Sequence, residues 1–152
     1  MNNYEKQKCL ELTIKMYHKD LCKPFREKVD PVKDGAPDYF LIISKPMDLG
    51  TIKKKLQNNE YTSVQEWIDD VELIWQNSML YNNEGSILHV IALELQGWFE
   101  NKIINMPRSK DEEWFHSMQK VTKKMIFLAE HAPTSITSSH QIRTKEVSSS
   151  YE

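Results

Sequence analysis

The chain has 152 residues, of which 39% are hydrophobic and 28% are charged, and its formal net charge is −2. A charge balance this close to zero gives no general electrostatic attraction to nucleic acid or to an anionic membrane surface. No apolar run approaches the roughly 20 residues that a membrane-spanning helix needs, so we expect neither nucleic acid nor a membrane as a direct partner.

The first expected element is a helix over residues 3 to 22. Its apolar residues recur at steps of three and four, which predicts one stripe that faces a core. That stripe consists of Leu10, Ile14, Tyr17 and Leu21, and Cys9, Leu12 and Met16 widen it. Lys23 and Pro24 should end this helix, because a residue before proline is disfavoured in the helical region.

A long connection follows, over residues 24 to 45. It holds three prolines together with many apolar and aromatic residues, so we expect it to pack against the domain. Next, Asp48 can cap a short helix. The residues of that helix expected to face inward are Leu49, Ile52 and Leu56.

A central helix is predicted to begin with a capping box of Ser63 and Glu66 and to run to Tyr81. The segment from Asn82 to Gly85 breaks the helical pattern. This break places the Asn82 amide at the edge of an apolar interior, where a polar group costs free energy unless a partner hydrogen-bonds it. We therefore expect a ligand site here, although Asn82 could also serve only as a turn residue.

Two further helices are expected towards the C-terminus. Ser86 should cap one that ends near Met106, and Asp111 should begin another. The apolar stripe of the last helix consists of Trp114, Met118, Val121, Met125 and Leu128. We expect its methionines to fill a core, with the stripe packing back on the domain; a dimer or a partner helix is the alternative. From Pro133 onwards the chain is rich in Ser and Thr, which predicts a flexible tail.

Several short motifs occur in a fixed order along these elements. They are Pro24-Phe25, Pro37-Asp38-Tyr39-Phe40, Pro46-Met47-Asp48-Leu49 with Thr51-Ile52, Asp70, Asn77 and Tyr81-Asn82. Together they resemble the bromodomain family over about residues 5 to 106. The resemblance implies an all-α, left-handed four-helix bundle with a long packed loop between the first two long helices. The expected parts are a bromodomain over residues 1–106, a helical extension over 107–131 and a Ser/Thr-rich flexible tail over 132–152.

The resemblance also implies a pocket for acetylated lysine between the two inter-helix loops. Carried over position by position, Asn82 would donate an amide N–H to the acetyl carbonyl, and Tyr39 would reach the same oxygen through a water. The other residues expected to contact the ligand are Pro24, Phe25, Val29, Tyr81 and Leu88, with Leu88 at the entrance. Without the resemblance, Tyr39 could be a core tyrosine with a satisfied hydroxyl.

The sequence departs from the common family pattern at the rim of this pocket. The expected rim residues are Lys23, Asp34, Ala36, Asn83 and Glu84. Many members have Trp in place of Lys23 and larger apolar residues in place of Asp34 and Ala36, and Cys is frequent where this chain has Ser78. We therefore expect a wider and more polar rim, which affects peptide preference more than the Asn82 contact.

No catalytic, metal or cofactor site is expected. Glu113 and His116 form one Glu-x-x-His motif, whereas the di-iron site of a helix bundle needs two such motifs and two further glutamates. The sequence has no Gly-rich phosphate loop and no nucleophile elbow. Cys9 and Cys22 are not spaced as a Cys-x-x-Cys pair, and we interpret them as reduced thiols.

Acetylation removes the charge of lysine, so the product can enter an apolar slot that excludes the ammonium ion. We therefore expect a non-catalytic reader of acetyl-lysine, with an acetylated histone tail or another acetylated protein as partner. The resemblance places it in a larger chromatin or transcription complex of the nucleus. The alternative is a bromodomain fold that acts as a protein interaction module, its altered rim marking the loss of acetyl-lysine binding.

Overall fold

The computed structural model describes residues 1–132, which form six α-helices and one 3₁₀-helix and no β-strand. In chain order the elements are α1 (Asn3–His18), η1 (Asp20–Phe25), α2 (Tyr39–Ile42), α3 (Leu49–Gln57), α4 (Val64–Tyr81), α5 (Ile87–Ile104) and α6 (Lys110–Glu130). The prediction of an all-α fold with an additional C-terminal helix is confirmed. Apart from Ala132, the tail expected over residues 132–152 lies outside the described residues.

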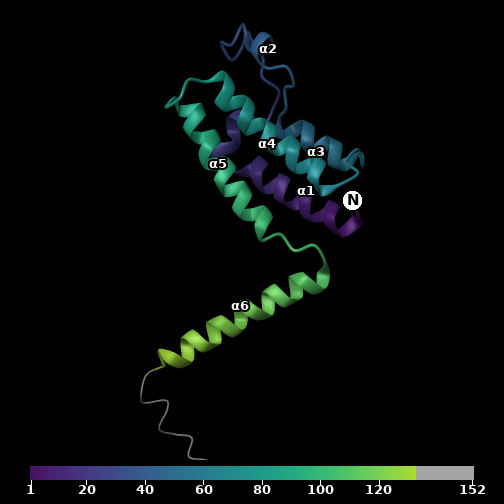
Figure 1. Ribbon diagram of the computed structural model, residues 1–152, viewed down its shortest axis with the longest axis vertical. Helices are drawn as coiled ribbons and strands as arrows, with labels where there is room; N and C mark the ends of the chain where they lie inside the picture. Colours follow the sequence, from purple (N-terminus) through teal and green to yellow (C-terminus); the bar gives the residue numbers. More distant parts are fainter. Residues whose placement is uncertain (133–152) are drawn as a thin grey trace, which may run out of the picture. The chain divides into compact units, whose positions relative to one another are not determined.

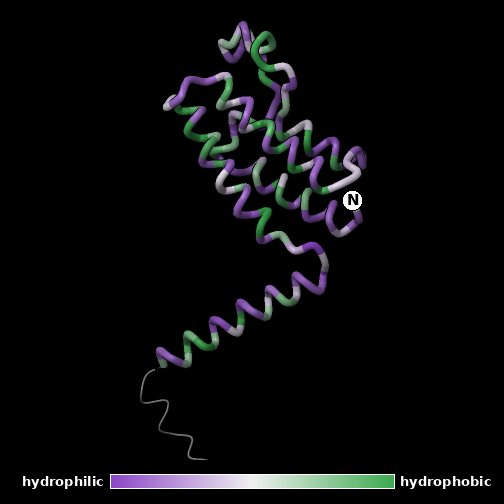
Figure 2. Tube along the Cα trace, viewed as in Figure 1, coloured by the Kyte–Doolittle hydropathy of each residue, from purple (hydrophilic) through white to green (hydrophobic). Residues whose placement is uncertain are grey.

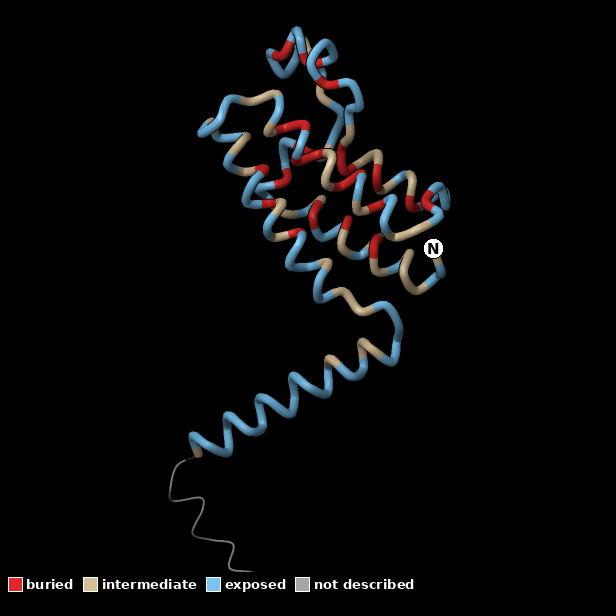
Figure 3. Tube along the Cα trace, viewed as in Figure 1, coloured by how far each residue is buried: buried red, intermediate tan, exposed pale blue. Residues whose placement is uncertain are grey.

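Helices α1, α3, α4 and α5 lie side by side and form a four-helix bundle (Figure 1). α4 packs along α5 and α1 packs along α3, while η1 contacts both α1 and α5. The buried residues gather where these helices face one another (Figure 3). α2 lies at the end of the bundle where α4 turns into α5 (Figure 1). α6 belongs to a second compact unit, which begins at Asp111.

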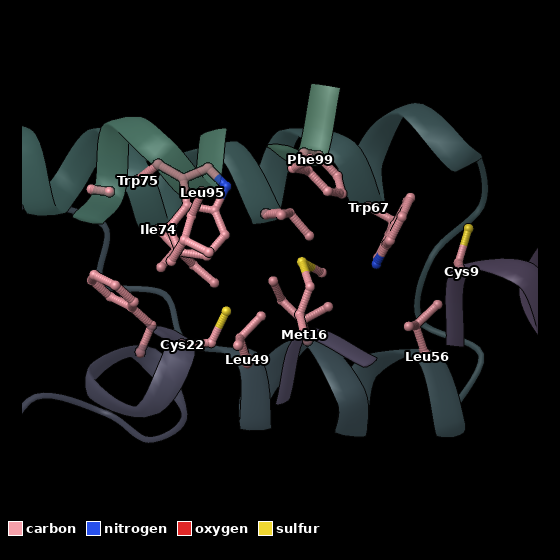
Figure 4. Close-up of a cluster of buried hydrophobic side chains, with 14 of the residues drawn as sticks. Cys9, Met16, Cys22, Leu49, Leu56, Trp67, Ile74, Trp75, Leu95 and Phe99 are labelled. Atoms are coloured by element: carbon pink, nitrogen blue, oxygen red, sulfur yellow. The ribbon is translucent and has the colours of Figure 1, made fainter. Parts of the chain in front are cut away.

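Two edge-to-face aromatic pairs lie within the bundle. The ring centroids of Trp67 and Phe99 are 5.5 Å apart, and those of Phe25 and Trp75 are 5.2 Å apart. Figure 4 shows the aliphatic and sulfur-containing side chains that share this core, among them Cys9, Met16, Cys22, Leu49 and Leu95. Burial of each large apolar side chain stabilises the fold by about 1.5–3 kcal/mol, so this core is the main source of stability.

Helix α1 is shorter than predicted. It ends at His18 rather than near Cys22, because Lys19 takes an extended backbone with φ −72° and ψ 131°. The chain then tightens into the 3₁₀-helix η1, which contains Pro24 and buries Cys22 and Phe25. The expectation that Lys23 and Pro24 end the first helix is therefore wrong.

The face of α1 that enters the core differs in part from the predicted stripe. Cys9 and Met16, which were expected to widen the stripe, are buried together with Thr13, whereas Ile14 and Leu21 are exposed. Thr13 can be buried because its hydroxyl is satisfied there: it donates to the Cys9 carbonyl at 2.8 Å. The same hydroxyl accepts the indole N–H of Trp67 at 3.0 Å, which joins α1 to α4.

Asp48 caps α3 as predicted, since its carboxylate accepts the backbone N–H of Thr51 at 2.8 Å. The three residues expected to face inward, Leu49, Ile52 and Leu56, are buried. At Gly50 a Cβ would lie 2.9 Å from the carbonyl oxygen of Arg26, so only glycine fits without a shift. The N–H of Gly50 donates to that same oxygen at 2.9 Å and ties the start of the long loop to α3.

Helix α4 begins at its predicted cap, where the Ser63 hydroxyl accepts the Glu66 N–H at 3.2 Å. Further along, the buried carboxylate of Asp70 accepts the hydroxyl of Tyr61 at 2.8 Å and pairs with Lys55. A buried carboxylate needs such partners, because an unpaired charge in a protein interior is costly. This group of bonds fastens α3 and the following turn to α4.

The long loop packs on one side only. Ala36, Tyr39 and Ile43 form a small buried cluster, with Val29 and Tyr81 against it. In contrast, Val32 and Leu41 are almost fully exposed, and Phe40 and Ile42 are also exposed. The expectation that the apolar residues of this loop pack against the domain is therefore wrong for these four.

Helix α6 forms as predicted, but none of its residues is buried. Met118 and Met125 are exposed on α6, and the expectation that they fill a core stays a prediction. Along the second half of this helix the trace in Figure 2 is largely hydrophobic. None of the helices in the described part of the chain is both long and apolar enough to cross a membrane.

We predict that Thr13→Val lowers the free energy of unfolding by about 1–3 kcal/mol, because the buried Trp67 indole N–H loses its acceptor while side-chain volume is kept. Urea unfolding followed by circular dichroism measures the change. In a Trp67→Phe background the same substitution should cost clearly less, since no indole N–H remains. An equal cost in both backgrounds would contradict the pairing.

Candidate functional site

A cavity of about 420 Å³ opens at the end of the bundle where the long loop meets the turn between α4 and α5. Its lining comes from η1, the long loop, α2, α4 and the start of α5. The lining residues are Pro24, Phe25, Glu27, Val29, Asp34, Gly35, Ala36, Tyr39, Met47, Ile74, Ser78, Tyr81, Asn82 and Leu88. Most of these side chains are apolar or aromatic, and the amide of Asn82 is among the few polar groups.

The structure brings all seven residues expected to contact a ligand to this one cavity. They are Pro24, Phe25, Val29, Tyr39, Tyr81, Asn82 and Leu88. Of the five expected rim residues, Asp34 and Ala36 line the cavity. Lys23, Asn83 and Glu84 are exposed and lie outside its lining.

Asn82 directly follows the last residue of α4 and is held there by Ser78, one turn earlier. The Ser78 carbonyl accepts the backbone N–H of Asn82 at 3.0 Å and its side-chain Nδ2–H at 2.8 Å. The only other contact of Nδ2 in the described chain is the Ser78 hydroxyl at 3.4 Å, which is long for a hydrogen bond. A backbone carbonyl therefore fixes the amide nitrogen of Asn82.

The first turn of α5 completes the support of Asn82. The hydroxyl of Ser78 donates to the carbonyl of Leu88 at 3.2 Å, which joins the end of α4 to the start of α5. His89 places Nδ1 3.3 Å from the carbonyl oxygen of Asn82, which accepts a hydrogen bond from the Nδ1–H tautomer. The Ser86 hydroxyl accepts the His89 N–H at 3.4 Å and caps this helix, as predicted. Asn82 is thus held from both helices.

Tyr39 and Tyr81 form the opposite wall. Their rings meet edge to face with centroids 5.1 Å apart, and the Tyr81 hydroxyl donates to Asp38 Oδ1 at 2.7 Å. That hydrogen bond raises the pKa of Tyr81, and burial, together with the charge of Asp48, raises the pKa of Tyr39. Both phenols therefore stay protonated at neutral pH. The Tyr39 hydroxyl bonds no other residue of the described chain, although Tyr39 is buried beside the cavity.

Comparison with known proteins adds to this geometry. The family model described as Bromodomain matches residues 9–94, which is more than half of the chain. The chain belongs to the bromodomain family. The match begins within α1 and ends within α5, so it covers the long loop and every residue that lines the cavity.

Three relatives of this bromodomain show how the match extends. Transcription factor GTE1 of Arabidopsis thaliana is 46% identical over 91 residues, 59% of this chain and 24% of the relative. SWR1 complex bromodomain subunit bdf1 of Schizosaccharomyces pombe is 40% identical over 99 residues, 65% of this chain and 17% of the relative. An ankyrin repeat, bromo and BTB domain-containing protein of Dictyostelium discoideum is 39% identical over 111 residues, 72% of this chain and 14% of the relative. The match therefore spans no more than about a quarter of these relatives.

Five lining residues are absent from the expected contact and rim residues: Glu27, Gly35, Met47, Ile74 and Ser78, of which Ser78 was noted only as a departure from the family pattern. Helical spacing could have found two of them. Ser78 and Ile74 lie four and eight residues before Asn82, so they share its face of α4. Glu27, Gly35 and Met47 belong to the irregular loop, where no periodicity indicates which side chains face a cavity.

The cavity of this bromodomain suits a neutral, largely apolar group that carries one hydrogen-bond acceptor. Phe25, Val29, Ile74 and Leu88 supply apolar walls, and Asn82 supplies an amide donor. The carboxylates of Glu27 and Asp34 also belong to the lining, which makes one part of the wall acidic. Within the described residues, no group of three or more His, Cys, Asp or Glu side chains is arranged to hold a metal ion.

We predict that Tyr81→Phe loosens the segment around α2, because the Tyr81–Asp38 bond ties the long loop to the end of α4. The stability loss should be small, since the bond is exposed. Hydrogen exchange should become faster at the amides of residues 39–43. Asp38→Ala should have the same effect, and the double variant should add nothing; additive effects would show that the two side chains act separately.

Proposed function

We propose that this bromodomain binds acetylated lysine in protein tails, histone tails in particular, without catalysing a reaction. The observation that carries the proposal is the position of the Asn82 amide at an apolar cavity of about 420 Å³. A donor in such a place selects for a neutral side chain that ends in a carbonyl oxygen.

The Asn82 amide nitrogen has a second N–H that a ligand can use. One hydrogen of Nδ2 goes to the Ser78 carbonyl at 2.8 Å, while the Ser78 hydroxyl, at 3.4 Å, holds the nitrogen only weakly. An acetyl carbonyl is a better acceptor and can take the second hydrogen. A hydrogen bond of this kind contributes roughly 0.5–1.5 kcal/mol net.

Tyr39 supports the same acetyl group. Its hydroxyl is protonated at neutral pH and bonds no other described residue, so it can donate to a water beside the cavity. A bridging water is nearly as favourable in enthalpy as a direct hydrogen bond. The water would then donate to the acetyl carbonyl, which receives two hydrogen bonds in total.

The apolar walls supply selectivity against unmodified lysine. An ammonium ion would have to shed its water against Phe25, Val29 and Leu88, whereas the acetylated side chain carries no charge. Glu27 and Asp34 beside the cavity favour basic residues next to the mark, as histone tails have. With one direct bond and one bridging water, we expect affinities on the order of 10 μM to 1 mM for a single mark.

The names of two relatives suggest in which kind of complex this chain works. One is called a transcription factor and another a subunit of the SWR1 complex. We infer that this chain works in the nucleus, with an acetylated histone tail or another acetylated protein as partner, in a larger chromatin or transcription complex. The bromodomain itself acts there as a non-catalytic reader.

We predict that Asn82→Ala lowers affinity for acetylated peptides by about twofold to tenfold, because the acetyl carbonyl loses its direct donor and keeps only the bridging water. An array of acetylated histone-tail peptides, with unmodified counterparts, identifies the peptide, and calorimetry measures its affinity. The control is Asn83→Ala, since Asn83 is the exposed neighbour and lies outside the cavity lining. If acetylated and unmodified peptides bind alike and neither variant matters, the chain is an interaction module instead.

We predict that Tyr39→Phe weakens binding of the same peptide by about twofold to tenfold, because only the bridged hydrogen bond is lost. Tyr17→Phe is the matched control, since Tyr17 lies on α1 and does not line the cavity. Calorimetry measures the affinity of the unsubstituted protein and of the two variants for this peptide. Unchanged affinity in Tyr39→Phe would remove Tyr39 from the site.

A further inference from the structure

Helix α6 exposes an unusual amount of apolar surface. Eight large apolar side chains on its 21 residues are exposed: Trp114, Phe115, Met118, Val121, Met125, Ile126, Phe127 and Leu128. A helix of this length is only marginally stable alone in water, and most helices in proteins depend on packing of an apolar face. The apolar face of α6 therefore requires a partner.

Five of these residues follow the spacing of a coiled coil. Trp114, Met118, Val121, Met125 and Leu128 are separated by steps of four, three, four and three. This is the alternation of the a and d positions of a heptad repeat, which makes a narrow seam suited to one facing helix. Met118 and Met125 occupy the a positions, and the other three occupy the d positions.

The charges of α6 are segregated along its length. The first turn carries Asp111, Glu112 and Glu113, and the basic residues Lys120, Lys123 and Lys124 follow in the second half. Between Trp114 and Ala129 there is no acidic residue. Two such helices side by side in parallel would bring like charges together, whereas an antiparallel pair brings acidic and basic parts together.

We propose that α6 pairs in antiparallel orientation with α6 of a second copy of this chain. The second copy carries a seam of the same length and a complementary order of charges, which is what favours it as the occupant. In this pairing Trp114 lies opposite Met125, and Met118 lies opposite Val121. Lys124 then comes within about one helical turn, roughly 5 Å, of the acidic first turn of the other copy.

The pairing accounts for most of the exposed apolar surface of α6. Four of the five seam residues lie opposite another seam residue, Leu128 lies opposite Asp111, and Phe115, at an e position, flanks the seam. Ile126 and Phe127 lie at b and c positions and stay outside it. The inference is independent of the proposed ligand, because it concerns only α6 and its copy.

Sedimentation equilibrium of the full chain over a hundredfold range of concentration tests the proposal. A reversible dimer is expected, and Val121→Glu should weaken it at least about tenfold, because a charge would be buried at the centre of the seam. Gln119→Glu adds the same charge off the seam and should leave the dimer intact. Circular dichroism and the thermal unfolding of each variant show whether the bundle stays folded.

Two results would overturn the proposal: a monomer at every concentration, or a dimer that Val121→Glu leaves unchanged. Orientation is read from spin labels on Lys110→Cys, with the unsubstituted protein as the blank. The antiparallel pair separates the two labels by about 30 Å, whereas a parallel pair would bring them to about 10 Å. A separation of about 10 Å would therefore overturn the antiparallel arrangement.

Discussion

The two hydrogen bonds that the Ser78 carbonyl accepts from Asn82 determine the geometry of the whole site. Because the backbone of Asn82 is extended, with φ −95° and ψ 139°, α4 cannot continue, and the Asn82 side chain folds back on the last turn. The hydroxyl of the same Ser78 reaches Leu88, so the first turn of α5 is fixed by the residue that fixes Asn82. A single helix end therefore positions Asn82, Leu88 and the start of the next helix.

The bundle is tightly packed along its length and more loosely packed at the end that carries the cavity. Along its length, buried polar groups are satisfied by side chains from other helices, as Thr13 is by Trp67 and as Asp70 is by Tyr61 and Lys55. Such bonds, together with the buried aromatic pairs, leave little room for alternative packing. At the end that carries the cavity, the loop keeps only a small cluster around Tyr39, and its other apolar residues face solvent. The cavity thus combines one rigid wall, from α4, with one wall held by few contacts.

Local signals in the sequence were sufficient for part of this structure. The caps at Asp48, Ser63 and Ser86 lie next to the helices that they begin, so the starts of α3, α4 and α5 could be predicted. The buried face of α1 could not, because burial of Thr13 depends on a tryptophan 54 residues later in the chain. Likewise, Asn82 and Tyr39 were found through short motifs, whereas Glu27 and Met47 meet the cavity only through the path of an irregular loop. The stripe of α6 was correct as a pattern, but a pattern alone does not show what covers it.

Burial of the two native thiols has a chemical consequence. Desolvation raises the pKa of Cys9 to about 12 and that of Cys22 to about 11, so hardly any thiolate exists at neutral pH. Because the thiolate is the reactive species in alkylation, oxidation and disulfide exchange, both sulfur atoms are nearly inert while the bundle is folded. Their modification by an alkylating reagent therefore reports opening of the core, and the native chain contains its own probe of global unfolding.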